Sequence, residues 1–390
     1  MVVLRVRVFV TFALLIGVLA PATTASAATT YEVEIGRFLE GAPAESMRFL
    51  PGSIDVHRGD TLHFSSFGFH TATLLPVGDG PVEWFDTMAE PGTSDPYAIF
   101  QPDPDDGSYK FSVQALLPSS FTCGAPAQPA CTFDGSSLID SGTPEEAALD
   151  FSTTVTAPRG SSFYVVCVIH GPKMRMEVNV VARSEPASDP ADLAAANDAA
   201  IQQDTDSARA LDEKFSALRT WHKGPDGSRV WDAWAGVENS NVALFAMYPR
   251  KLVLEKGDTV QLHFDSLNYE PHSATFPVDV GKEIVRGSFY PSCDPDGDAG
   301  PGPDNPPDLE APPFCADPTQ LELNFDPRFV PVGGNGTFRG ADLESSGVRG
   351  LLSPLGDDNW DLAFTRTSGD EPFRYLCLVH PWMRGRVVVR

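Results

Sequence analysis

The stretch Tyr375–Met383, YLCLVHPWM, near the end of the sequence decides how the rest of the chain is interpreted. An apolar run leads to Cys377, and His380 and Met383 follow at intervals of three residues. A thiolate, an imidazole and a thioether form a soft ligand set, which suits copper and suits magnesium or calcium poorly. The spacing predicts a strand that ends at the cysteine and a short loop that turns His380 and Met383 onto one metal ion.

The ligands of this loop cannot close a metal site alone, so we expect a distant histidine to complete it. His272, in the segment NYEPHSATFP, is the candidate. The same constellation occurs earlier, in FGFHTATLLP and YVVCVIHGPKM, where the candidate ligands are His70, Cys167, His170 and Met174. One isolated set of this kind could consist of ordinary core residues. Two complete sets in one chain favour two metal sites.

An internal duplication accounts for the two sets. Gly-Asp-Thr occurs at 59–61 and again at 257–259, each time before a strand that runs towards the first histidine of the set. Aligning the two halves puts Met174, and not Met176, opposite Met383, so Met174 is the better candidate for the ligand. Because several separate motifs recur in the same order, duplication is the simplest interpretation.

Both halves resemble the cupredoxins, whose signature is an upstream histidine followed by Cys-x-x-His-x(2–4)-Met. The resemblance covers the opening strands and the closing strand–loop–strand of each half, but not the long middles at about 78–152 and 281–368. It implies an all-β protein of two Greek-key β-sandwiches in tandem, with ordered insertions in the middles. It also implies two type-1 (blue) copper ions per chain that transfer single electrons.

Cupredoxins also place a hydrogen-bonding residue directly after the first histidine, and here that residue is Thr71 or Ser273. The resemblance implies that its backbone N–H reaches the thiolate and that its hydroxyl ties the two ligand loops together. Such contacts hold the ligands and tune the potential of the metal. Trp382 lies inside the second ligand loop, where cupredoxins present an apolar patch. It is either a docking residue or a lid that keeps water off the metal.

The chain divides into four segments. Residues 1–27 combine two arginines, an apolar run and a small-residue cleavage site, which is the pattern of a secretory signal peptide. We place the first cupredoxin-like domain at 28–183, a short helical linker at 184–222 and the second cupredoxin-like domain at 223–390. We expect the mature protein to be secreted, into the extracellular or cell-envelope space, with no transmembrane segment after signal removal.

The linker shows a helix start and one apolar face. Asp189-Pro190 has the pattern of an N-cap followed by proline at the first helical position. Apolar residues then recur at the spacing of one helical face, at Ala208, Leu211, Phe215 and Leu218. The pattern predicts an interdomain helix that packs on at least one domain rather than a solvated spacer.

Six cysteines divide into two functional classes. Cys167 and Cys377 are the proposed metal ligands. One close-spaced pair per half remains in loops rich in proline and glycine, and these residues are Cys123, Cys131, Cys293 and Cys315. In an oxidising compartment such pairs form local disulfides, so we expect Cys123–Cys131 and Cys293–Cys315.

The acidic composition limits the possible partners. The formal net charge of −25 argues against nucleic acid, whose binding rests on lysine and arginine contacts to phosphate. A cationic redox partner protein would be attracted, although a large negative charge can equally serve solubility alone. The sequence gives no indication of the oligomeric state.

Two other functions compete with electron transfer. Two-domain copper oxidases and nitrite reductases also carry cupredoxin repeats, but this sequence has no His-x-His pair, and Cys167 and Cys377 are flanked by valines and leucines. A trinuclear copper cluster is therefore disfavoured, and an enzyme is the less favoured function. A lone type-2 copper stays open, with His63, His222 and His263 as its candidate ligands. A copper carrier without a redox partner is the third alternative.

Overall fold

The computed structural model describes residues 28–88, 97–102, 109–143, 148–264, 270–288, 290–293 and 321–390. The predicted signal peptide and the predicted disulfide Cys293–Cys315 lie outside the described residues and side chains. β-Strands dominate these ranges, and the helices within them number four. The all-β, tandem cupredoxin-like fold predicted from the sequence is confirmed.

Each half contains two packed sheets, and the strand order is the same in both halves. In the first half, one sheet has the order β8 (Cys131–Phe133), β10 (Leu149–Val155), β4 (Thr61–Ser66), β1 (Thr30–Leu39) and β2 (Ala44–Leu50). The other has the order β3 (Ser53–His57), β12 (Gly171–Val181), β11 (Ser162–Cys167), β5 (Thr73–Leu74) and β9 (Ile139–Asp140).

The second half repeats these orders strand for strand. Its first sheet runs β21 (Thr337–Phe338), β23 (Trp360–Phe364), β17 (Thr259–His263), β14 (Arg229–Glu238) and β15 (Val242–Tyr248), with β13 (Trp221–Lys223) paired to β14. Its second sheet runs β16 (Lys251–Leu254), β25 (Arg384–Val389), β24 (Phe373–Leu376), β18 (Thr275–Phe276) and β22 (Glu344–Ser345). The internal duplication seen in the motifs therefore extends to the whole strand order.

The strands follow the alternation of the sequence. In β4, buried Leu62 and Phe64 alternate with half-buried Thr61 and His63, which is the two-residue period of a strand with one face in the core. β10 alternates in the same way. The inner faces of the two sheets therefore meet in an apolar core, which also contains the candidate ligands Cys167 and Cys377.

The two halves share one continuous sheet. β2 pairs antiparallel with β15, with Glu45 opposite Ala243. Backbone hydrogen bonds extend the contact from Met47 N to Asn241 O at 2.8 Å and from Phe245 N to Pro43 O at 2.6 Å. Each half thus covers the exposed edge that the other half would otherwise leave open. The junction between the halves is fixed by main-chain hydrogen bonds.

The long middles also meet each other. Strands from both halves form a four-stranded sheet, in the order β19 (Tyr290–Cys293), β20 (Leu321–Asn324), β7 (Tyr109–Phe111) and β6 (Phe100–Pro102). The remaining helices of the described middles are α1 (Pro81–Met88), α2 (Val113–Leu116) and α4 (Val278–Arg286). The predicted disulfide between Cys123 and Cys131 is present, with the two Cα atoms 4.9 Å apart.

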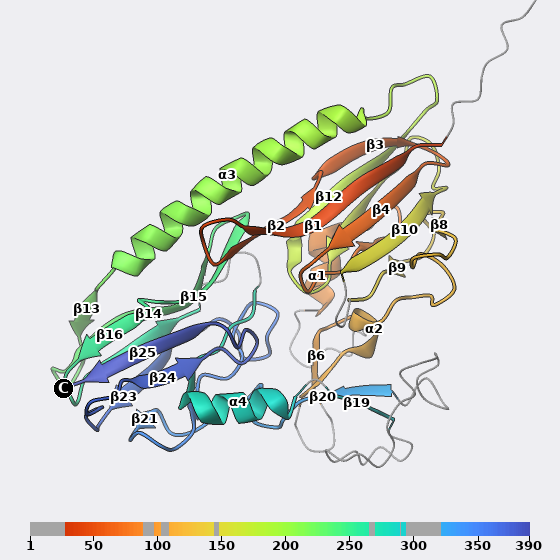
Figure 1. Cartoon of the computed structure of the whole chain (residues 1–390). Helices are drawn as coiled ribbons and strands as arrows, with labels where there is room; N and C mark the ends of the chain where they lie inside the picture. Colours follow the sequence, from red (N-terminus) through yellow and green to blue (C-terminus); the bar gives the residue numbers. More distant parts are fainter. Residues whose placement is uncertain are drawn as a thin grey trace, which may run out of the picture.

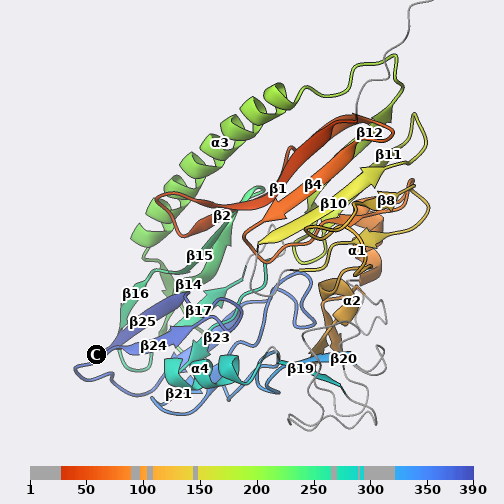
Figure 2. The same cartoon turned by 45° about the vertical axis from the view of Figure 1, so that its right-hand side comes forward.

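Helix α3 (Pro190–Ala217) spans 28 residues, so it is longer than the short linker helix expected from the sequence. Asp189 caps it by accepting a hydrogen bond from Ala191 N at 2.8 Å. Ala208, Leu211 and Phe215 pack against a cluster that contains residues of β1, β2 and β15, whereas Leu218 is the C-cap. The helix therefore lies along the junction and contacts both halves (Figures 1 and 2).

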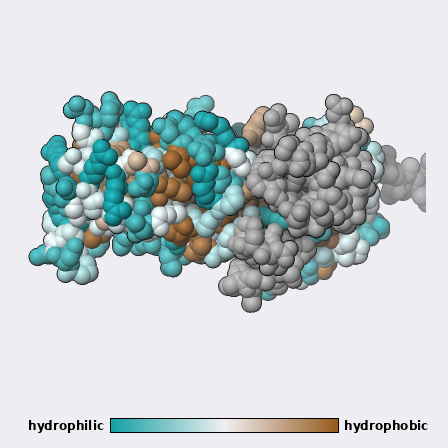
Figure 3. All heavy atoms as spheres, turned by 90° about the horizontal axis from the view of Figure 1, so that it is seen from below, coloured by the Kyte–Doolittle hydropathy of each residue, from teal (hydrophilic) through white to brown (hydrophobic). Residues whose placement is uncertain are grey.

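One face of the molecule is mostly hydrophilic. Seen from below the view of Figure 1, the described residues present mostly hydrophilic atoms, with hydrophobic side chains gathered near the middle of this face (Figure 3). No helix within the described ranges combines the length and the apolar character that a membrane span requires.

Replacement of Asp204 should loosen α3 from the junction. The side chain is 2% exposed and accepts hydrogen bonds from Ser46 Oγ at 2.7 Å and from Arg48 Nε at 2.8 Å. Asp204→Ala should lower the free energy of unfolding by about 3 kcal/mol, because it leaves a guanidinium and a buried hydroxyl without their acceptor. Urea denaturation measures this loss. Asp206→Ala, on the exposed side of the same helix, should change stability by less than about 0.5 kcal/mol.

Candidate metal centres

The first site forms where the end of β11 meets the loop after β4. His70 follows β4, Cys167 is the last residue of β11, and His170 lies in the turn before β12. The Nδ1 atoms of His70 and His170 are 3.0 Å apart, and the Cys167 Sγ lies 3.8 Å and 3.2 Å from them, respectively. All three side chains are buried. Their ligand atoms converge on one point, as a trigonal metal site requires.

The second site has the same construction. His272, Cys377 and His380 offer ligand atoms that lie within 4.8 Å of one another, and all three residues are buried. Backbone hydrogen bonds from Cys377 N to Met383 O at 3.1 Å and from Met383 N to His380 O at 2.8 Å close the ligand loop. Met383 and its counterpart Met174 are both buried in the core cluster that contains the two cysteines. The structure therefore brings together the two histidines and the cysteine of each predicted set.

Thr71 and Ser273 make the contacts that the resemblance implied. Thr71 N donates to Cys167 Sγ at 3.4 Å, and its Oγ1 accepts from the backbone N of the residue after that cysteine at 2.9 Å. Ser273 N donates to Cys377 Sγ at 3.3 Å, and its Oγ accepts from the residue after that cysteine at 2.7 Å. In both sites one side chain ties the first histidine loop to the cysteine strand.

The surroundings favour the thiolate form of both cysteines. Burial raises the pKa of Cys377, but the imidazoles of His272 and His380 outweigh burial and lower it to about 5. The pKa of Cys167 is likewise held well below its usual range, because His170 and His70 outweigh burial. The thiolate is the form of cysteine that binds metal ions. Both cysteines are thus prepared as ligands.

His272 gives an independent indication of a missing ligand partner. Both of its ring nitrogens are buried, and neither has a hydrogen-bond partner in the described part of the chain. A buried polar group left without a partner costs about 1–3 kcal/mol. A metal ion bound beside the Cys377 sulfur would satisfy one of these nitrogens, so the residues present fit a soft transition metal.

Two glycines leave room for the first histidine of each site. Gly36 lies in a bulge of β1 with φ +67°, and a Cβ there would lie 2.3 Å from His70 Nε2. Gly236 lies in the matching bulge of β14 with φ +78°, and a Cβ there would lie 2.2 Å from His272 Nε2. Only glycine can therefore stand behind each imidazole, a requirement that no motif in the sequence indicated.

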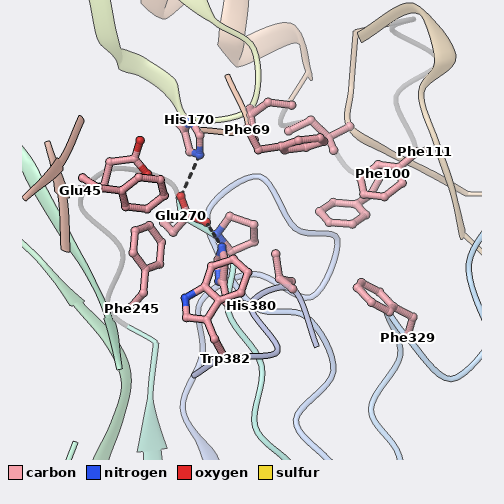
Figure 4. Close-up of a pocket in the computed structure, with 15 residues that line it drawn as sticks. Glu45, Phe69, Phe100, Phe111, His170, Phe245, Glu270, Phe329, His380 and Trp382 are labelled. Atoms are coloured by element: carbon pink, nitrogen blue, oxygen red, sulfur yellow. Dashed lines mark ion pairs between the residues drawn. The ribbon is translucent and has the colours of Figure 1, made fainter. Parts of the chain in front are cut away.

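One carboxylate joins the two sites. Glu270 Oε2 accepts from His170 Nε2 at 2.8 Å, and Glu270 Oε1 accepts from His380 Nε2 at 2.9 Å (Figure 4). Burial raises the pKa of Glu270, but the two imidazoles outweigh it and hold the pKa well below its usual range. The carboxylate in turn raises the pKa of His380 to about 10, against the effect of burial and together with Cys377. The two sites therefore face each other across the junction.

A second carboxylate supports only the first site. Glu45, in β2, accepts from His70 Nε2 at 2.7 Å. Across the junction, Glu45 pairs with Ala243, which stands at the matching position of the second half. Among the residues that the structure describes, His272 therefore has no carboxylate of this kind behind it. The duplicated sites differ in the charge next to their first histidine.

A cavity of about 260 Å³ lies beside the bridging carboxylate (Figure 4). It reaches His170 and His380, together with Glu45 and Glu270. Most of its wall is apolar, and the aromatic part comes from Phe38, Phe69, Phe100, Phe111, Phe245, Phe329 and Trp382. The histidine edges thus open into an apolar space between the halves, and not directly onto a flat protein surface.

The two carboxylates, Glu270 and Glu45, were missed in the sequence, although Glu270 carried a signal. Aligning the first histidines of the two halves puts Glu270 opposite Gly68, so an acidic residue stands two positions before His272 where the other half has none. A difference between repeats next to a ligand indicates a feature special to one site. Glu45 carried no such signal, because it lies in a strand remote in sequence from every ligand.

The other histidines considered for a type-2 copper lie away from the sites. His63 contacts Glu32 and Asp150, and His263 contacts Asp232 at 3.0 Å. His222 lies in the exposed strand β13. Within the described ranges, the only groups of three close metal-binding side chains are the two cysteine sites.

Comparisons with known proteins give no family or curated relative: no family model and no curated protein matches the chain. Similar solved structures include auracyanin B, at 14% identity over 40% of this chain and 90% of that one, with a TM-score of 0.22. Blue copper oxidase from Nitrosomonas europaea has 8% identity over 93% of this chain and 86% of that one, with a TM-score of 0.18. Copper-containing nitrite reductase from Thermus scotoductus SA-01 has 13% identity over 93% of this chain and 68% of that one, with a TM-score of 0.21. Similarity this low carries no conclusion about function.

Gly236→Ala should disable the second site alone. The new methyl group would overlap the His272 ring, so the histidine must leave its position. We expect metal binding at the second site to be lost and the first site to keep its spectrum, measured by metal analysis and optical spectroscopy.

Gly257→Ala is the matched control for this change. Gly257 also has a positive φ, +98°, but a Cβ there meets no atom within 4 Å. This variant should lose about 1–3 kcal/mol of stability through backbone strain and keep both sites. Equal metal content in the two variants would contradict the role assigned to Gly236.

Proposed function

We propose that the chain is an exported protein that binds two type-1 copper ions and acts in one-electron transfer. The observation that carries the proposal is the pair of buried groups of one thiolate and two imidazoles, each with a backbone N–H directed at the sulfur. Thiolate and thioether sulfur favour Cu(I), and imidazole accommodates Cu(II). Zinc accepts the same ligands, so the choice of copper rests on the full set with its buried methionine.

The protein's part in this function is to hold the ligands still. Copper, when bound, supplies reversible one-electron chemistry. Thr71 and Ser273 tie the ligand loops together, and Glu45 and Glu270 fix the orientation of three of the four imidazoles. Burial of the ligands excludes water. A site that changes little between oxidation states is suited to electron transfer, and outer contacts of this kind tune its potential.

Export and partners belong to the same proposal. The signal pattern of residues 1–27 supports export, and the Cys123–Cys131 disulfide suits an oxidising compartment. The net charge of −25 would attract a cationic redox partner protein. Trp382 is 61% exposed, and its ring lies 5.2 Å from that of His380, which makes it a candidate contact for such a partner.

A copper oxidoreductase is the second candidate, and one observation favours it. The cavity between the halves reaches the histidines of both sites and has room for a small molecule. Turnover of a small electron donor or acceptor by the copper-loaded protein would support this candidate. A copper carrier, by contrast, would bind copper without reversible reduction and oxidation.

Copper loading tests the proposal directly. Aerobic loading of the purified protein should give two type-1 copper ions per chain, by metal analysis and by optical and paramagnetic-resonance spectra. Cys377→Ser should remove the thiolate absorption of the second site only, because the first site has its own complete ligand set. Cys167→Ser should do the reverse. A third copper ion with a type-2 spectrum would contradict the proposal and favour an enzyme.

The two sites should differ in reduction potential, and the first should be lower. The buried carboxylate of Glu45 lies against His70 and stabilises the more positive, oxidised site, whereas His272 has no such neighbour in the described residues. Lys173 acts in the opposite direction, but it is exposed and therefore screened. Redox titration of Cys167→Ser and Cys377→Ser measures the two potentials separately. Glu45→Gln should raise the potential of the first site, and equal potentials in the two cysteine variants would contradict the asymmetry.

A further inference from the structure

The two candidate sites are connected by an unbroken chain of side-chain atoms. His170 turns Nδ1 towards the Cys167 sulfur at 3.2 Å and Nε2 towards Glu270 at 2.8 Å. His380 turns Nδ1 towards the Cys377 sulfur at 3.8 Å and Nε2 towards the other oxygen of the same carboxylate at 2.9 Å. Only two hydrogen bonds therefore separate a ligand of one site from a ligand of the other.

This connection is buried and charge-assisted. Glu270 is 3% exposed, and the two imidazoles are 4% and 9% exposed. Hydrogen bonds between an ionised carboxylate and an imidazole are shorter and stronger than neutral ones, and a low local dielectric strengthens them further. A contact of this kind holds the two rings at a fixed separation, which a pair of water-exposed rings would not keep.

We propose that Glu270 is the electron bridge between the two metal sites, so that the protein works as one coupled pair and not as two independent carriers. An electron passes from the reduced ion of one site to the oxidised ion of the other, along His170, Glu270 and His380. One site is oxidised as the other is reduced, and no proton or further reactant takes part. The inference rests on the proposed function, because it requires copper in both sites.

The position of Glu270 supports a role between the sites. Glu45 is the internal comparison: it makes the same type of contact to His70, but it touches an imidazole of the first site only. Glu270 instead uses both oxygens on histidines of different halves. Support of one ligand requires only one oxygen, so the two-sided contact points to a function shared by both sites.

Electron redistribution within the copper-loaded full chain tests the bridge. A radical pulse delivers less than one electron per oxidised chain, and the absorption of each site is followed with the spectra of Cys377→Ser and Cys167→Ser as references. We expect a concentration-dependent reduction and then a redistribution whose rate does not depend on protein concentration. The second phase should be absent in both cysteine variants.

Three substitutions separate the bridge from general effects of charge. Glu270→Gln removes the charge-assisted contacts and should slow the redistribution roughly 10–100-fold after correction for the measured potentials. Glu270→Asp keeps the charge but is one methylene shorter, so it cannot span both rings and should be slow as well. Glu45→Gln is the matched comparison, because it removes a charge from the other imidazole of the first site. It should shift that site's potential and leave the path intact.

The outcomes distinguish the bridge from the proposed function. Two intact blue sites without a concentration-independent phase in the wild-type protein would overturn the bridge and leave the proposed function standing. Redistribution at the wild-type rate in Glu270→Gln or in Glu270→Asp would also overturn it. Failure of the wild-type protein to form blue sites would instead refute the proposed function. If the Glu270 variants do not hold copper, the wild-type protein decides. A redistribution whose rate does not depend on protein concentration supports the coupled pair, and the absence of this phase overturns it.

Discussion

The main-chain pairing of β2 with β15 is the constraint on which the rest of the structure depends. It merges the two halves into one sheet, with Glu45 opposite Ala243. This pairing sets the separation and orientation of the two sandwiches, since α3 and the four-stranded sheet of the insertions only add contacts across the same junction. Every contact between the sites follows from it. A shift of this register by one residue would displace His170 of the first half from Glu270 of the second half, and the contact between the sites would be lost.

The junction contains charges that would be costly elsewhere. A buried carboxylate loses its hydration, and only close partners with good geometry offset this loss. Glu270 has two such partners, one from each half, and so it stabilises the junction only when both halves are in place. The same carboxylate thus contributes to assembly and to the arrangement of the sites. Because removing one partner of a buried charge costs more than removing both, the three residues act as a unit.

Much of each site could be predicted from the sequence, and the reason is local geometry. Cys377, His380 and Met383 lie in one strand end and one loop, so their spacing alone indicates that they converge. The helix at 190–217 could also be predicted from its cap and its apolar face. The pairing of β2 with β15 could not be predicted, because the pattern of an alternating or apolar strand does not specify which strand of the other half will pair with it. Glu270 takes its role from that pairing, and Glu45 takes its role from the position of β2 beside β1, so neither role could be derived from the sequence pattern around the residue.

The duplication makes the remaining differences between the sites informative. The two halves share their strand order, their glycine bulges and their hydroxyl ties, so a difference at matching positions is a difference within an otherwise equal frame. Three such differences surround the ligands: Glu45 against Ala243, Gly68 against Glu270, and Asp140 against Ser345, which pair with Thr73 and Thr275. Asp140 is buried, and burial raises its pKa well above the usual range, although Thr73 donates to it at 2.8 Å. Two identical carriers would need none of these changes. A pair in which one site gives electrons to the other, as proposed above, needs unequal surroundings and a path between the sites. Glu45, opposite Ala243, would supply the inequality, and Glu270, opposite Gly68, would supply the path.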